Sequence, residues 1–152
     1  MSLPFDPSTI DPDEFGEKQT TIKMDHQEAI EYVRAVCKDV GFGFPAEFSP
    51  STMLNEKVDA DRDPYYVLGA CNPAMADRAL DATGNRIGAL FPCNMVIWQE
   101  QPGVQRVYHV SIMKIARLLG MSTNDDELDA IIDETGEMVE AVFEQLENKP
   151  ER

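Results

Sequence analysis

The spacing of apolar residues along this chain switches between a period of two and a period of three to four. Polar and apolar residues roughly alternate over 19–24 and again over 42–48, which predicts two short strands. Between them lies a set of apolar residues at helical spacing: Ala29, Ile30, Val33, Val36, Cys37 and Val40. Asp25 precedes this set as a helix cap and Gly41 follows it as a C-cap, so the pattern predicts one helix between the two strands.

The rest of the chain continues as short strands and helices. The pattern predicts a short helix over 49–56, strands over 65–70, 87–98 and 104–112, and helices over 73–81, over 113–119 and from 124 onward. Three prolines among aspartates predict an extended N-terminal arm over 1–17. Residues 18–148 then form a single α+β domain, with a mixed sheet of about five strands and helices mainly on one face, before a tail over 149–152.

The length and the apolar content fit one globular domain in the cytoplasm. A chain of 152 residues has room for one sizeable core, and 43% of its residues are hydrophobic. Its apolar runs fall short of the roughly 18 residues that span a bilayer, and its start lacks the features of a secretory signal. The three cysteines include no Cys-x-x-Cys pair, so we expect reduced thiols and a soluble cytoplasmic protein without membrane partners.

The excess of acidic residues argues against one class of partner, nucleic acids. The net charge is −15, with 28 acidic residues against 13 basic ones. Such a surface repels phosphate backbones, so we expect no nucleic-acid partner. An acidic composition that is poor in lysine is typical of a salt-rich cytoplasm, where counterions screen self-repulsion. The composition therefore predicts a halophilic, archaeal source, with an ordinary acidic mesophilic protein as the alternative.

Two cysteines stand in similar settings, Gly-Ala-Cys-Asn-Pro over 69–73 and Leu-Phe-Pro-Cys-Asn over 90–94. Asn72 can cap a helix whose first position is Pro73. Cys71 would then lie just ahead of a helix N-terminus, where partial positive charge favours a thiolate. The alternative is that Cys71 is simply a small residue in a tight turn between strand and helix.

The direction of the strands decides whether the two thiols meet. If the strands that carry Cys71 and Cys93 run parallel, the thiols lie on the order of 15 Å apart. If these strands run antiparallel, both cysteines fall at one end of the sheet and could approach bonding distance. The sequence leaves both arrangements open.

The two thiols and His109 are weak candidates for a soft-metal site that binds Cu(I) or Zn. Met75, Met95 and Met113 could add thioether ligands. Their spacing matches no finger or ribbon motif. In the alternative interpretation the methionines fill gaps in the core and His109 lies at a strand surface. The sequence requires no cofactor.

The segments over 66–76 and 87–97 closely resemble the domain-of-unknown-function 302 family, and so does the helix before Gly-Phe-Gly at 41–43. The resemblance spans roughly residues 18–148. It implies a small α+β domain of the type called TT1751-like, and a homodimer, but no settled activity. The residues that match the family pattern are Cys71, Asn72, Pro73, Pro92, Cys93 and Asn94. Departures lie after the Gly-Phe-Gly strand and over 113–120.

Three functions are compatible with these features. We favour a dimeric binding module for a small ligand or soft metal, or for redox sensing, built from Cys71, Asn72, Cys93 and Asn94. A second hypothesis is a thiol-dependent enzyme with Cys71 as nucleophile, which would also need a general base. In the third, the thiols only pack and the protein acts through its interaction surface. We expect a binding module rather than an enzyme.

Overall fold

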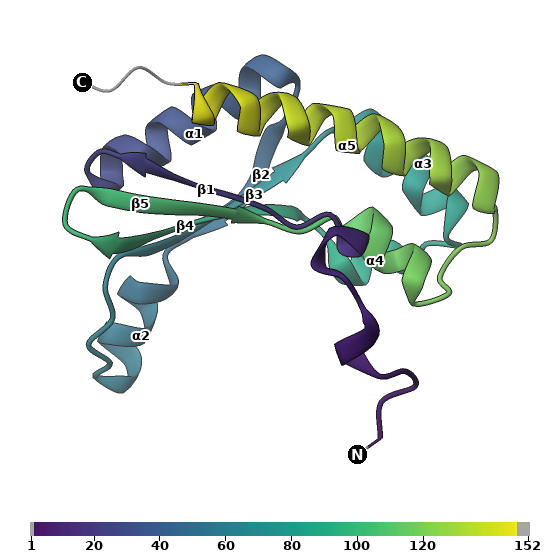
Figure 1. Ribbon diagram of the computed structural model, residues 1–152, viewed down its shortest axis with the longest axis horizontal. Coiled ribbons are helices and arrows are strands. Elements are labelled where there is room, and N and C mark those ends of the chain that lie inside the picture. The colour runs from purple at the N-terminus through teal and green to yellow at the C-terminus, as the bar shows by residue number, and fades with distance from the viewer. Residues whose placement is uncertain (1, 149–152) are drawn as a thin grey trace.

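A five-stranded antiparallel sheet forms the centre of the structure, a computed structural model that describes residues 2–148 (Figure 1). Its strand order is β1-β5-β4-β3-β2. The strands are β1 (Lys18–Lys23), β2 (Gly43–Phe48), β3 (Tyr65–Cys71), β4 (Cys93–Gln101) and β5 (Val104–His109). The three strands β3, β4 and β5 follow one another in the chain and lie side by side, so that the first two strands end up at the two edges.

Helices cover one face of this sheet. The long helices α1 (His26–Val40) and α5 (Asp125–Glu147) lie across it, whereas α2 (Pro50–Val58) projects from the opposite side at one end (Figure 1). The shorter helices are α3 (Pro73–Ala82), η3 (Arg86–Leu90) and α4 (Ile112–Leu118). Both α3 and α4 pack against α5, beyond the end of the sheet.

This arrangement confirms the α+β class and the single sheet of five strands. The sheet is antiparallel throughout rather than mixed, because every neighbouring pair of strands runs in opposite directions. The same finding settles how the thiols lie. In the antiparallel pairing of β3 with β4, Ala70 is the register partner of Cys93, so Cys71 and Cys93 lie at the same end of adjacent strands.

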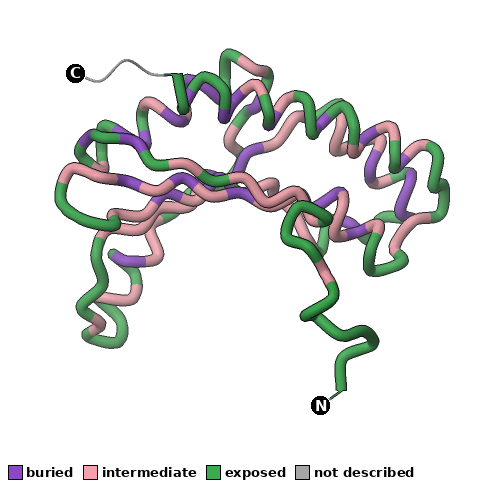
Figure 2. Tube along the Cα trace, in the orientation of Figure 1, coloured by how far each residue is buried: buried purple, intermediate pink, exposed green. Residues whose placement is uncertain are grey.

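The buried apolar residues, which are among those drawn in purple in Figure 2, belong to two hydrophobic clusters. The larger lies between the sheet and the helices α1 and α5, and includes Leu68, Met95, Ile97 and Val107. The smaller lies among α3, α4 and α5 around Ile87. Burial of apolar surface at roughly 25 cal/mol per Å² is what holds the layers together.

Two predicted boundaries were wrong. The strand predicted over 87–98 begins only at Cys93, because residues 86–90 form η3, in which the buried Ile87 donates its N–H to the hydroxyl of Thr83. Pro92, which has no N–H for a strand ladder, separates η3 from β4. The strand predicted over 104–112 ends at His109, because Ser111 caps α4 by accepting the N–H of Lys114.

The N-terminal arm also differs from the extended segment predicted. It contains two single 3-10 turns, Pro7–Thr9 and Pro12–Phe15. In each turn an aspartate caps and a proline takes the first helical position, which is the same signal that starts α3 at Asn72 and Pro73. The tail predicted over 149–152 lies outside the described residues.

Candidate functional site

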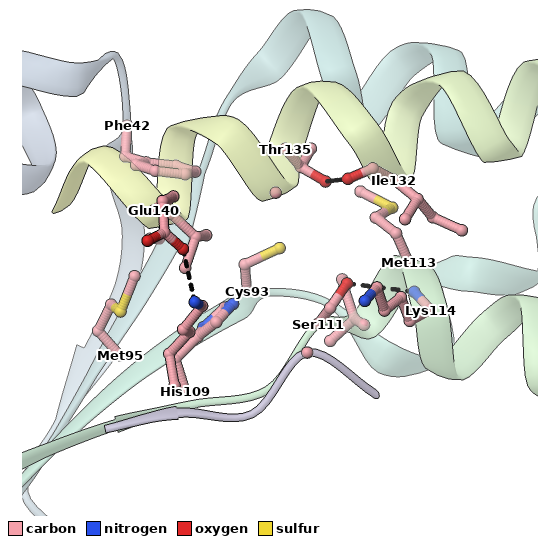
Figure 3. A pocket seen from close by; sticks show the side chains of 16 residues that line it. Phe42, Cys93, Met95, His109, Ser111, Met113, Lys114, Ile132, Thr135 and Glu140 are labelled. Carbon is pink, nitrogen blue, oxygen red and sulfur yellow. Dashed lines mark hydrogen bonds and ion pairs between the residues drawn. The ribbon is translucent and has the colours of Figure 1, made fainter. Parts of the chain in front are cut away.

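A cavity of about 270 Å³ lies between the end of the sheet and α5 (Figure 3). It exists because small residues face one another there. The sheet presents Ala70 and Cys93, and α5 presents Thr135 and Gly136. A Cβ built on Gly136 would meet nothing within 4 Å. Larger side chains at these four positions would fill the space between the layers, as they do elsewhere in the core.

The register of the strands sets which side chains line the floor of the cavity. Lys18 on β1 is the register partner of His109 on β5, and continuing the β4–β5 register by one residue places Met95 on the other side of His109. Cys93 lies two residues before Met95 on the same face. Diagonal neighbours on one face of an antiparallel pair lie roughly 7–8 Å apart, so the thiol and the imidazole share the cavity.

His109 is the buried polar group of this floor, with 3% of its surface exposed. Its Nδ1 lies 2.8 Å from the main-chain oxygen of Asn94. Because a carbonyl oxygen only accepts, Nδ1 carries the proton and donates it, which leaves Nε2 as an acceptor in the neutral ring. Burial lowers the pKa of His109, which keeps the ring neutral at pH 7.

Cys93 and Cys71 are both protonated thiols at neutral pH. Burial, with a smaller contribution from the nearby Cys71, raises the pKa of Cys93 to about 12. Burial also raises the pKa of Cys71, the opposite direction to the one expected from the α3 N-terminus. In Figure 3 the sulfur of Cys93 points into the space under α5. Both thiols line a smaller adjoining cavity of about 80 Å³.

The two asparagines of the doubled motif do different things. Asn72 is the predicted cap of α3, where its side chain accepts the N–H of Met75 and donates to the main-chain oxygen of Gly41. Asn94 follows Cys93 on β4, and successive residues of a strand point to opposite faces. Its side chain is therefore exposed on the other face of the sheet, and its contribution to the cavity is the carbonyl that holds His109.

Charged groups form the rim of the larger cavity. Lys18 Nζ lies 2.5 Å from a carboxylate oxygen of Glu140 on α5, and this contact raises the pKa of Lys18. Lys114 Nζ donates to the main-chain oxygen of Asp13 in the N-terminal arm. The arm is held further by the N–H of Ser111, which donates to the main-chain oxygen of Phe15 at 2.7 Å. Strand, helix and arm thus meet at the rim.

The weak metal candidates lie near one another: Cys93 and His109 line the larger cavity, and Cys71 and Cys93 line the smaller one. Within residues 2–148, no group of three or more His, Cys, Asp or Glu side chains is placed to hold a metal ion. The Nδ1 of His109 donates to the main-chain oxygen of Asn94, and burial raises the pKa of both thiols.

Sequence reasoning missed the α5 wall of the cavity. The last helix was predicted from its apolar stripe, and Thr135 and Gly136 interrupt that stripe. Thr135 donates its hydroxyl to the main-chain oxygen of Ile131 and is buried. Two small residues at the centre of an otherwise aliphatic stripe were the available signal, but their partners on the sheet were not predictable from spacing.

Comparisons with known proteins identify the class of the chain. A family model described as "Domain of unknown function DUF302" matches residues 18–146, so the chain belongs to this family. A solved structure, of an uncharacterized conserved DUF302 protein from Bacillus stearothermophilus, is similar with a TM-score of 0.73 at 24% identity. The alignment covers 86% of this chain and 97% of the other, which shows the shared fold. No curated protein matches.

Several expectations from the sequence stay predictions. They are the cytoplasmic location, the salt-rich source and the homodimer. Among the helices of residues 2–148, none has the length and apolar character needed to cross a membrane. The family match by itself assigns no ligand, partner or reaction to the chain.

Proposed function

We propose that this protein is a binding module for a small, largely apolar molecule held in the cavity between the sheet and α5. The observation that carries the proposal is the cavity of about 270 Å³ where small residues of the two layers face each other. Well-packed cores contain few voids larger than a water molecule, so an opening of this size beside a buried histidine is a departure from ordinary packing.

The size and the lining of the cavity suit a compact ligand. An engineered apolar cavity of about 150 Å³ binds benzene, so this space has room for a ring with a substituent. Phe42, Met95 and Met113 supply apolar walls, and His109 supplies one polar group. A few polar groups in an otherwise apolar concavity is the usual composition of a small-molecule site.

The state of the thiols supports binding rather than catalysis. Nucleophilic attack and soft-metal ligation both need a thiolate, whereas burial raises the pKa of Cys71 and that of Cys93. A protonated thiol behaves as a small apolar group with a weak donor. Cys93 accordingly contributes surface and shape to the proposed site, and Cys71 does the same in the adjoining smaller cavity.

Binding of a probe can be followed on the methionine methyl groups by NMR. Toluene should cause saturable shifts of the Met95 and Met113 signals, which lie at the cavity, while methionines remote from it stay unchanged. Gly136→Leu, which places a large side chain at the cavity wall, should abolish the shifts. Gly136→Ala is the matched control and should retain them. Absence of saturable shifts in the wild-type protein would refute the proposal.

We also propose that the open face of the sheet pairs with a second copy of the chain. On this face Tyr65 stacks on Trp98, with ring centroids 5.7 Å apart, and Trp98 contacts Tyr108 at 6.0 Å. Phe48 continues the patch at the edge and is 51% exposed. Rows of aromatic side chains on an uncovered sheet are typical of an interface, and a second copy covers both patches at once.

The oligomeric state tests this second proposal. Light scattering coupled to size-exclusion chromatography should give twice the mass of the chain for the wild type and the monomer mass for Phe48→Glu. Leu119→Glu changes an equally exposed apolar residue beyond the C-terminus of α4 and should stay dimeric. A wild-type monomer across the micromolar range would contradict the proposal.

A further inference from the structure

The buried imidazole of His109 has one ring nitrogen that the fold does not use. Nδ1 donates to the main-chain oxygen of Asn94, and the hydrogen bonds of the described chain include none to Nε2. Among the buried side-chain nitrogen and oxygen atoms of the described residues, only Ser122 Oγ lacks a hydrogen-bond partner, so the unbonded Nε2 is not enclosed by protein and keeps access to open space. His109 lines the cavity, which is where a partner for Nε2 has room to sit.

The other polar groups around the cavity already have partners. Thr135 donates its hydroxyl to Ile131, and Lys18 at the rim pairs with Glu140. Lys114 donates to a main-chain oxygen of the arm. The ammonium of Lys114 has no carboxylate partner among the described residues, but it lies at the rim. A charged ligand in the largely apolar interior would lose its hydration, which is strongly unfavourable.

We propose that the cavity selects a small uncharged hydroxyl compound, aromatic or aliphatic, whose O–H donates to Nε2 of His109. This inference rests on the proposed function and adds the chemical class of the ligand. The Asn94 carbonyl acts as a positioning group, since it fixes the proton on Nδ1 and turns the acceptor nitrogen toward the occupant. The apolar part of the ligand contacts Cys93, Met95 and Met113.

Phenol and toluene form a matched pair of probes, because they differ in the hydroxyl that would reach Nε2. The measured quantity is the ratio of their dissociation constants, compared between the wild type and His109→Leu. This double difference removes the unequal cost of taking the two probes out of water. Loss of the acceptor should shift the ratio about tenfold toward toluene, as expected for one buried hydrogen bond. Met113→Leu, which changes the wall but not the acceptor, should leave the ratio unchanged.

A measurement on the wild-type protein covers the case in which His109→Leu does not fold. The chain has two histidines, so the ¹⁵N signals of His109 are assigned by comparison with His26→Gln. Phenol should move the Nε2 signal of His109 upfield toward that of a hydrogen-bonded nitrogen, and toluene should not. Equal effects of both probes, or an unchanged ratio in His109→Leu, would overturn the inference while leaving the binding module intact. Failure of both probes to bind would instead remove the proposed function, and the inference with it.

Discussion

The two faces of the sheet use the same strands for different purposes. On the covered face, Leu68, Ile97 and Val107 are fully buried beneath the helices. On the open face, the register places Tyr65, Trp98 and Tyr108 in a partly exposed aromatic row. Alternation within each strand produces both sets, so a single residue step separates core from surface.

The cavity on the covered face has a local origin. The covered face gains a cavity because α5 meets the strand ends with Thr135 and Gly136, opposite Ala70 and Cys93. On the open face, Tyr65 and Trp98 border a hollow of about 450 Å³ that is wider and more open to solvent. This difference is the basis for proposing a small ligand on the first face and a second copy of the chain on the other.

The largest expected effect is on the reaction rate of the Cys93 thiol on the covered face. At pH 8, Cys93 should react with iodoacetamide about a thousandfold more slowly than a thiol with the ordinary pKa of 9.0, since its own pKa is about 12. Peptide mass spectrometry measures the rate at each cysteine, and the urea-unfolded chain is the control. If native Cys93 reacts as fast as the unfolded chain, the enclosed character of this face is disproved.

The second-largest expected effect is a loss of stability caused by a steric clash on the open-face side of β3. A Cβ on Gly69 would lie 2.3 Å from the main-chain oxygen of Ala46 and 2.7 Å from the ring of Pro92. Gly69→Ala should therefore lower the free energy of unfolding by about 3 kcal/mol, as overpacking does. Urea unfolding followed by circular dichroism provides the measurement. An unchanged midpoint would mean that β2 and β3 separate more easily than their close packing indicates.

Acid should weaken the covered face through His109. Its pKa in the folded protein is lowered below 6.5, so the unfolded chain takes up the proton first as the pH falls. This contribution to stability is complete above about pH 6.5 and is lost below it, by up to about 1.4 kcal/mol at pH 5.5. Urea midpoints at pH 7.5 and 5.5 test this, and His109→Gln should reduce the loss; an equal loss in His109→Gln would contradict the prediction.

The smallest expected effect is an increase in the free energy of unfolding. Gly136 lies inside α5 and a Cβ there meets open space, so Gly136→Ala removes the helix cost of glycine without a clash. The free energy of unfolding should rise by up to about 1 kcal/mol, measured as a higher urea midpoint. A decrease would show that the α5 wall is packed more closely at the cavity than the structure indicates.

Local patterns in the sequence were enough for most of the elements. The apolar stripe of α1 and its end at Gly41, the Asn72–Pro73 start of α3 and the Asn124 cap of α5 all depend on a few neighbouring residues, and each is present. The Asp25 cap is an exception in detail, because Asp25 holds the cap position without a side-chain hydrogen bond. Misplaced boundaries fell where a cap or turn interrupted an apolar run, as at Ser111.

The doubled Cys-Asn motif shows the limit of spacing arguments. Its sequence carried the resemblance to the family, which the match over 18–146 confirms, but it left open whether the two cysteines meet at one end of the sheet. The motif alone did not distinguish the roles of its two cysteines and two asparagines. Asn72 caps a helix, Asn94 faces away from the cavity, and burial rather than the helix N-terminus determines the direction of the Cys71 pKa shift.

The sequence by itself determined the α+β class and the number of strands, because periodicity and caps are local properties of the chain. Only the tertiary structure decided the antiparallel order, the cavity and the orientation of His109. Each of these depends on side chains more than ten residues apart in sequence, such as Cys93 and Gly136. Packing between layers sets their distances and solvation, and one-dimensional spacing carries no information about either.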